Sequence, residues 1–261
     1  MFLKTVSEKL YERALKYTNN SRIEDFVIGI GLTGVRLNDG RTGICYTNKE
    51  DTLGRCEEFY TCTGDEGNPQ SKIELGMNTD ELLKIGLFSG DPLLRSVAYA
   101  ALNAVFVVPE IEERYKYGDI SEYLEVDFED VVGMIGEINP LINLWKPLVW
   151  DILIFDRKRR NEKIFPDWAI VDFLSKCSVV AITGSSVVNG TIDWILKYIN
   201  TDRIAIIGPS TPLIPDVFNV KVLAGVKVLD SEKLFNLISK GAGTKKIIAE
   251  KAVQKVVLLQ D

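Results

Sequence analysis

Two short clusters of glycine and hydroxyl residues are the strongest chemical signal in the sequence. The first is Thr183-Gly184-Ser185-Ser186, and the second is Gly208-Pro209-Ser210-Thr211. Side-chain hydroxyls and the backbone N–H groups at the start of a helix suit an anion or the polar edge of a ring. Ser and Thr are also ordinary helix N-caps, so each cluster taken alone has a purely structural explanation.

The segments around the two clusters predict that they lie side by side. Each cluster follows a short β-branched run, residues 179–182 and Ile204–Ile207, which is typical of strands buried in a parallel sheet. Between them, the apolar residues of 187–196 keep helical spacing. Neighbouring parallel strands bring their carboxyl ends to one edge, where open α/β sheets hold their ligands. The residues expected to bind a ligand there are Thr183, Gly184, Ser185, Gly208, Pro209, Ser210 and Thr211.

The candidate general bases are carboxylates, because the chain has no histidine. This excludes Ser–His–Asp and Cys–His triads and leaves Asp, Glu, Lys, Tyr, Cys or water for proton transfer. A predicted strand over 131–135 leads to Gly136-Glu137, and a predicted strand over 148–155 ends in Asp156. Asp156 follows Gly136 by twenty residues, near the spacing at which nucleotide-binding α/β domains keep a ribose-binding acid. Glu137 is the first candidate base and Asp156 the second, whereas the basic run 157–160 fits a solvated loop best.

An asparagine in the N-terminal half is a further candidate. Asp91 and Pro92 predict the start of a helix that runs to about Phe106. Asn103 lies in its apolar part, among residues that are expected to be buried. A polar side chain in such a helix faces either water or a site, and here the pattern favours a site.

The motif Gly29-x-Gly31-x-x-Gly34 resembles a dinucleotide-binding fingerprint, but its context argues against one. No helix follows it, and Asn38-Asp39-Gly40 predicts a hairpin turn. We therefore expect a three-stranded antiparallel meander.

The segment 48–76 reads as a long loop. Its Cys56 and Cys62 could be ligands of a soft-metal site, but two incidental thiols in a loop are the better interpretation. We therefore expect both to be reduced and metal-free.

Composition limits the class of protein. Lys+Arg 31 against Asp+Glu 37 gives a net charge of −6 with dispersed basic residues, so nucleic acid is not an expected partner. No apolar run reaches the length of a membrane span and no signal peptide is recognised, which predicts a cytoplasmic location. A change from mixed α and β patterns to a βαβα rhythm predicts two domains. They are an α+β domain over 1–120 and an α/β domain with a parallel sheet over 121–261.

These segments together resemble a family described as "putative heavy-metal chelation". The resemblance rests on residues 182–186 with Asn189-Gly190-Thr191, on residues 208–212, and on Leu223-Ala224-Gly225; residues 133–136 and 101–104 also fit. It implies an enolase N-terminal-like domain followed by a Rossmann-like domain. It also implies a small-molecule site in the cleft between them, lined by the two turns, Gly136, Asn189 and the helix that carries Asn103.

Two functional hypotheses follow from this resemblance. The first is an enzyme that acts on a pterin-, flavin- or siderophore-like metabolite. The second is a non-enzymatic protein that carries or buffers a metal–chelator complex. Because the chain has no histidine, a metal held by an organic chelator fits better than one held by the protein. The sequence assigns no cofactor, predicts a small molecule as partner and leaves a homo-oligomer open.

Overall fold

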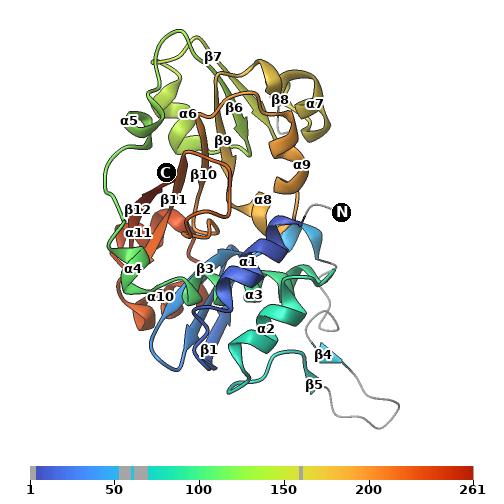
Figure 1. Ribbon diagram of the computed structural model, residues 1–261, viewed down its shortest axis with the longest axis vertical. Coiled ribbons are helices and arrows are strands. Elements are labelled where there is room, and N and C mark those ends of the chain that lie inside the picture. The colour runs from blue at the N-terminus through green and yellow to red at the C-terminus, as the bar shows by residue number, and fades with distance from the viewer. Residues whose placement is uncertain (1–3, 53–59, 62–69, 159–160, 261) are drawn as a thin grey trace. The chain divides into compact units, whose positions relative to one another are not determined.

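The computed structural model describes residues 4–52, 60–61, 70–158 and 161–260 (Figure 1). These residues form two compact units. Unit 1 takes its residues from Met1–Glu113 and Val226–Lys255, and unit 2 from Arg114–Gly225 and Val256–Asp261. The domain boundary predicted after residue 120 stays a prediction, but residues 226–255 group with the N-terminal part of the chain.

Unit 1 contains a three-stranded antiparallel sheet. Its strands are β1 (Ile23–Ile28), β2 (Leu32–Leu37) and β3 (Thr42–Tyr46), in the order β1-β2-β3. The predicted meander is therefore confirmed. The glycine motif lies in it, with Gly29 and Gly31 between β1 and β2 and Gly34 inside β2.

The other elements of unit 1 are mostly helical. They are α1 (Val6–Ala14), η1 (Lys49–Asp51), β4 (Tyr60–Thr61), β5 (Gln70–Ser71), α2 (Thr79–Gly86), α3 (Pro92–Val105), α4 (Pro109–Glu112), α10 (Ser231–Ser239) and α11 (Thr244–Ala249). As predicted, Asp91 caps α3: its carboxylate accepts hydrogen bonds from Leu93 N at 2.9 Å and Leu94 N at 3.1 Å. Asn78 precedes α2, but its side chain makes no capping hydrogen bond.

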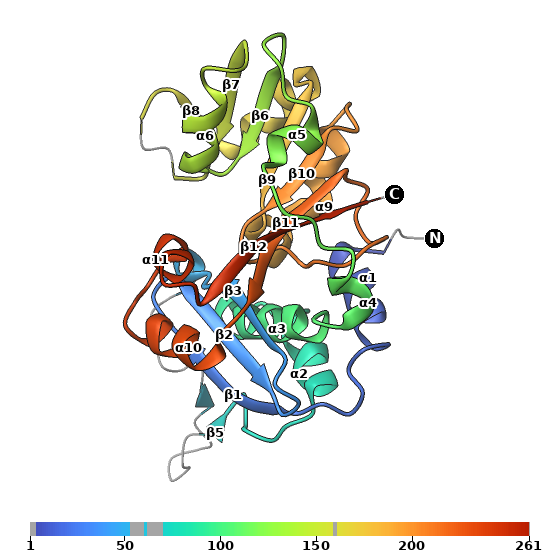
Figure 2. The ribbon, with the colours of Figure 1, turned by 90° about the vertical axis from the view of Figure 1, so that its left-hand side faces the viewer.

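Helices cover both faces of this sheet (Figure 2). A Cβ atom added to Gly43 would lie 2.2 Å from Ala104 N, so α3 packs directly on β3. A Cβ added to Gly34 would lie 3.0 Å from the Phe235 ring of α10. Gly34 is paired with Ile44, the neighbour of Gly43, and successive residues of a strand point to opposite faces. The α10 face is filled by one apolar cluster of Leu32, Ile44, Leu234, Phe235, Ile238, Ile247, Ala252 and Val253.

The larger sheet has seven strands in the order β12-β11-β10-β9-β6-β7-β8. They are β6 (Val131–Ile135), β7 (Asp151–Phe155), β8 (Ile164–Phe165), β9 (Val179–Thr183), β10 (Ile204–Ile207), β11 (Val222–Val228) and β12 (Val253–Leu259). All neighbouring pairs from β11 to β8 are parallel. β12 runs the other way, because Leu229 N donates to Ala252 O and Gln260 N donates to Lys221 O. The predicted parallel sheet therefore ends in one antiparallel strand.

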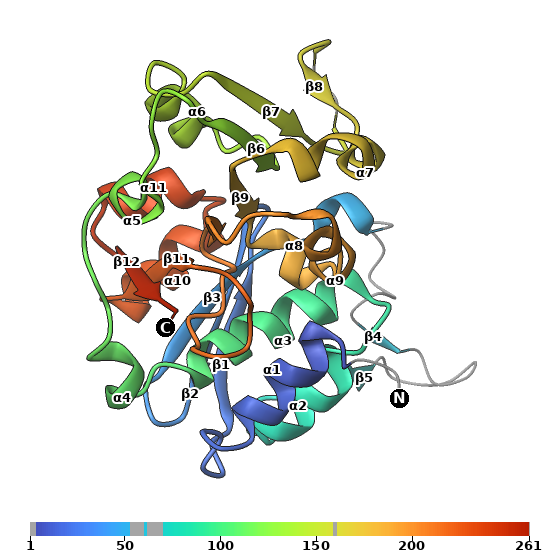
Figure 3. The same cartoon turned by 45° about the horizontal axis from the view of Figure 1, so that its top comes forward.

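Short helices connect these strands. They are α5 (Ile120–Leu124), α6 (Asn139–Trp145), η3 (Asp167–Ala169), α7 (Ile170–Phe173), η4 (Leu174–Lys176), α8 (Ser185–Val188), α9 (Ile192–Ile195) and η5 (Leu196–Tyr198). The single helix predicted over 187–196 is wrong. Gly190 adopts a φ of +78° and divides the segment into α8 and α9, which follow β9 (Figure 3). The strand predicted from residue 148 begins only at Asp151, because Leu148 N turns back to Trp145 O.

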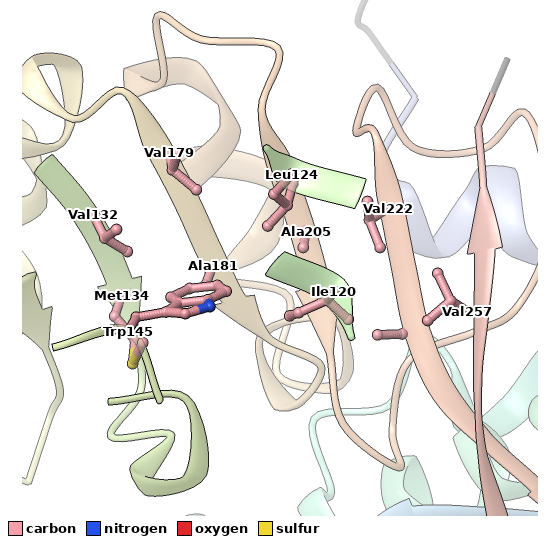
Figure 4. Packing of buried hydrophobic residues seen from close by; sticks show 11 residues of the cluster. Ile120, Leu124, Val132, Met134, Trp145, Val179, Ala181, Ala205, Val222 and Val257 are labelled. Atoms are coloured by element: carbon pink, nitrogen blue, oxygen red, sulfur yellow. The ribbon is translucent and has the colours of Figure 1, made fainter. Parts of the chain in front are cut away.

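One buried cluster of unit 2 lies on one face of this sheet. Ile120 and Leu124 of α5 and Trp145 of α6 belong to the same buried cluster as the strand residues (Figure 4). The strands contribute Val132, Met134, Val179, Ala181, Ala205, Val222, Ala224 and Val257. Small residues in the central strands leave room for the fully buried indole of Trp145.

Candidate functional site

The two hydroxyl-rich turns lie at the same edge of the larger sheet. Residues 204–207 of β10 pair in parallel with residues 180–183 of β9, so both strands end side by side. A Cβ atom added to Gly184 would lie 2.8 Å from both the backbone N and Oγ1 of Thr211. The two turns therefore touch at Gly184, and this position has no space for a side chain.

A third turn, after β6, lies next to the turn after β9. Gly136 adopts a φ of +88°, and a Cβ atom added to it would lie 2.9 Å from Cγ2 of Thr183. Both the backbone conformation and the close contact require glycine at this position. Gly136 N donates to Phe155 O of β7 at 2.7 Å, which ties the turn to the next strand.

The turn after β7 completes the row. The Asp156 carboxylate accepts a hydrogen bond from Glu137 N at 3.1 Å through Oδ2, and one from Lys158 N at 2.7 Å through Oδ1. The four turns are residues 136–137, 156–158, 183–185 and 208–211, and they follow strands that are neighbours in the sheet. We call this row the four-turn edge.

The hydroxyl groups of the four-turn edge differ in their surroundings. Thr183 Oγ1 and Ser185 Oγ share a hydrogen bond of 3.1 Å, and both residues are half-buried. Ser210 and Thr211 are buried. Thr211 Oγ1 has no hydrogen-bond partner among the described residues. A buried hydroxyl without a partner costs free energy, so Thr211 is a candidate donor for a bound molecule.

Several backbone N–H groups expected to be available have partners within the protein. Gly184 N donates to Ile207 O at 2.8 Å, and Gly208 N donates to Ala224 O at 2.9 Å. Thr211 N donates to Gly208 O at 3.0 Å. For these three groups the expectation of a free donor is wrong, because they hold each turn to the neighbouring strand or close the turn itself.

The two candidate asparagines have identified structural contacts. Asn189 Oδ1 accepts hydrogen bonds from the backbone N and the hydroxyl of Thr191, at 3.0 and 2.7 Å, and so fixes the start of α9. Asn103, in unit 1, is half-buried, and its Nδ2 donates to Ile44 O of β3 at 2.8 Å. A role in ligand binding stays a prediction for both residues, as it does for Pro209 and the half-buried Glu137.

The described side chains offer no cluster of protein ligands for a metal ion. Within the described part of the chain, no three His, Cys, Asp or Glu side chains come together as potential ligands. Cys45 and Cys177 are buried thiols, and burial, with a smaller effect of Asp151, raises the pKa of Cys177 to about 11. Cys56 and Cys62 lie outside the described residues. The described side chains therefore do not fit a metal centre.

Sequence reasoning missed the structural role of Asp156. Its carboxylate is the contact between the turns after β6 and β7, and both of its oxygens accept backbone hydrogen bonds. The bond from Lys158 N, two residues on, is a local signal, since Asp side chains often bond the backbone at that spacing. The bond from Glu137 N depends on the pairing of β6 with β7 and has no local signal.

Comparisons with known proteins agree with this fold. The chain is similar to a crystal structure of a protein of unknown function from the DUF364 family of Pyrococcus horikoshii, with 22% identity and a TM-score of 0.79; the match covers 97% of this chain and 99% of the other. A DUF364 protein of unknown function from Desulfitobacterium hafniense gives 24% identity and a TM-score of 0.74, with 97% and 98% covered. No curated protein gives a significant match.

Among the described residues, no helix has the length and apolar character needed to cross a membrane.

Two family models match the sequence, one over residues 11–106 and one over residues 119–257. Both carry the description "Putative heavy-metal chelation", and the second model alone matches more than half of the chain. The chain therefore belongs to the DUF364 family of that description.

Proposed function

We propose that the four-turn edge binds a small oxygen-rich metabolite of the pterin, flavin or siderophore type and that the protein is an enzyme acting on it. The observation that carries the proposal is the meeting of the turns after β6, β9 and β10 at Gly136, Gly184 and Thr211. Open α/β sheets hold their ligands at the carboxyl ends of their strands. Glycine at crowded positions lets the turns approach one another closely, and hydroxyl groups beside them supply hydrogen bonds.

The hydroxyls of Thr183, Ser185 and Thr211 would bind carbonyl or anionic oxygens of the metabolite. Glu137 is the better candidate base, because the carboxylate of Asp156 already accepts two backbone hydrogen bonds. A general base must come within hydrogen-bond reach of the proton that it removes. Glu137 directly follows Gly136, the residue that lies against Thr183, and this position supports the assignment.

The second candidate function is a non-enzymatic carrier of a metal–chelator complex. The observation that favours it is the contrast between the family description and the described side chains, which do not assemble a metal site. A metal would then reach the protein inside an organic ligand, and no protein base would be needed.

Native mass spectrometry of freshly purified protein, combined with elemental analysis, tests both functions. We expect a bound organic molecule at up to one per chain, and its loss in the variant Thr183→Val/Ser185→Ala. The control is Ser239→Ala, which removes a hydroxyl at the exposed end of α10. Conversion of the molecule by wild type but not by Glu137→Gln supports the enzyme, and binding of a metal chelate without conversion supports the carrier. Retention of the molecule by the double variant would contradict a site at the four-turn edge.

A further inference from the structure

The carboxylate of Asp156 joins two neighbouring turns through both of its oxygens. Oδ2 accepts from Glu137 N at 3.1 Å, across the strand pair, and Oδ1 accepts from Lys158 N at 2.7 Å, within its own turn. The backbone N of Asp156 donates to Phe165 O of β8 at 3.0 Å. Asp156 is thus held by the sheet and in turn fixes the backbone on either side of it.

The segment that Asp156 fixes begins the basic run 157–160, of which the structure describes Arg157 and Lys158. Arg157 and Lys158 are exposed and follow the carboxyl end of β7 directly. The chain as a whole has a net charge of −6, so a pair of adjacent cations at the edge of the sheet runs against its overall charge. A flexible lysine or arginine on a solvated loop loses much of its interaction energy to conformational entropy. The carboxylate of Asp156 holds the backbone of this segment, so only the two side chains have to be ordered when an anion binds.

We propose that Arg157, Lys158 and the turn at residues 136–137 form a subsite for an anionic group of the ligand, and that Asp156 is its positioning residue. The chemistry is that of a phosphate or a carboxylate, which both cations would bind by charge-assisted hydrogen bonds. The inference rests on the proposed function, because the same four-turn edge would hold the rest of the molecule.

The dimensions of the four-turn edge define the ligand further. From the turn after β10 to the turn after β7 there are three interstrand spacings of about 4.8 Å, or roughly 14 Å in all. The hydroxyls of Thr183, Ser185 and Thr211 belong to one end of this span and the two cations to the other. The ligand is therefore an elongated molecule with an oxygen-bearing group at one end and an anion at the other.

Calorimetric titration with inorganic pyrophosphate and inorganic phosphate, at constant ionic strength, tests the subsite. Each exposed ion pair contributes modestly, so neutralising both cations in Arg157→Gln/Lys158→Gln is expected to weaken pyrophosphate binding about tenfold. It should also reduce the dependence of the affinity on salt. The matched control, Lys240→Gln/Lys245→Gln, removes the same charge from exposed residues around the start of α11 and should bind as wild type does.

The variant Asp156→Asn separates positioning from charge. Removal of a negative charge beside two cations would by itself strengthen anion binding. Loss of one accepting oxygen frees part of the turn, so a positioning role predicts weaker pyrophosphate binding with an unchanged salt dependence. Tighter binding by Asp156→Asn would contradict the positioning role, and equal binding by wild type and Arg157→Gln/Lys158→Gln would overturn the subsite.

The variant Thr183→Val/Ser185→Ala keeps this test distinct from that of the proposed function. It leaves both cations in place and removes hydroxyls of the neighbouring turn, so it should lose the copurifying molecule while pyrophosphate binding keeps its dependence on Arg157 and Lys158. Loss of that molecule with no effect of the cation variant on pyrophosphate would refute the subsite and leave the proposed function standing. Retention of the molecule, with pyrophosphate binding that depends on the cations, would refute the proposed function instead.

Discussion

Arg203 and Asp130 form a bidentate ion pair at the amino ends of β10 and β6. Nη1 lies 2.7 Å from Oδ1, and Nη2 lies 2.8 Å from Oδ2. Ser178, which precedes β9, donates its hydroxyl to Asp130 Oδ1 at 2.7 Å, and Arg203 Nε donates to Leu124 O at 2.8 Å. One buried carboxylate therefore joins three neighbouring strands and, through Arg203, the end of α5.

The variant Asp130→Asn should lower the free energy of unfolding by about 3 kcal/mol at pH 7, because it leaves a largely buried arginine without its counter-ion. Equilibrium unfolding in urea measures this loss. Asp202→Asn, at an exposed neighbouring position, is the control and should change stability little. An equal effect of the two variants would show that the ion pair does not stabilise the fold.

The stability contributed by Asp130 should depend on pH. Burial acts to raise the pKa of Asp130, but hydrogen bonds from Arg203, Asp127 N and Ser178 outweigh it and bring the pKa below its ordinary value. A carboxyl with a lowered folded-state pKa contributes stability above its unfolded pKa of about 4 and loses it as pH falls through the folded value. The difference between wild type and Asp130→Asn should therefore be largest near neutral pH and shrink below about pH 4. A difference that grows in acid would contradict this assignment.

Thr211→Val should leave the ligand-free protein as stable as wild type or up to about 2 kcal/mol more stable, since it removes a buried hydroxyl that has no partner in the described part of the chain. The matched variant is Thr33→Val, at an equally buried residue whose hydroxyl bonds to Thr47 Oγ1 at 2.9 Å. It should lose about 1 kcal/mol. Thermal unfolding of ligand-free samples compares them, and the reverse order would show that Thr211 has a partner in solution.

Gly43→Ala should destabilise the protein by about 3 kcal/mol or prevent folding, because the new methyl group would meet the α3 backbone at Ala104 N and Ala100 O. Gly31→Ala is the control: a Cβ atom there has no neighbour within 4 Å among the residues that the structure describes. Urea unfolding measures both. A neutral Gly43→Ala would mean that α3 can move away from β3 at little cost.

Cys177 should resist alkylation in the native protein. Its thiol is buried, and its pKa of about 11 keeps the reactive thiolate scarce at neutral pH. Treatment with iodoacetamide at pH 7.5, followed by peptide mass spectrometry, should find Cys177 modified only after denaturation. Rapid native modification would indicate local opening around β9.

The sequence predicts best those elements whose limits are local. The runs at 131–135 and 204–207 have the predicted bounds, because short β-branched strands can be recognised without knowledge of a distant partner. The helix predicted over 187–196 is interrupted at Gly190, which has a positive φ. The spacing of the hydrophobic residues does not reveal this interruption. Residues 226–255 belong to the same compact unit as β1–β3. This grouping arises from tertiary packing, which no local sequence pattern predicts.

The candidate site divides in a similar way. That the turns after β9 and β10 share an edge follows from the parallel pairing of two recognisable strands. The states of individual groups do not follow from it. The N–H groups of Gly184 and Gly208 donate to neighbouring strands, and the hydroxyl of Thr211 is buried. Both features depend on how closely the turns approach each other, which no local sequence pattern gives.

The composition of unit 1 has a consequence for protein synthesis. One face of β2 and β3 is covered by Phe235 and Ile238 of α10, which the ribosome makes only after almost all of unit 2. A nascent chain that has already exposed β1–β3 therefore carries an uncovered apolar surface until α10 leaves the exit tunnel. During that interval chaperones and self-association compete with folding, and the pace of translation between β3 and α10 affects the yield of native protein.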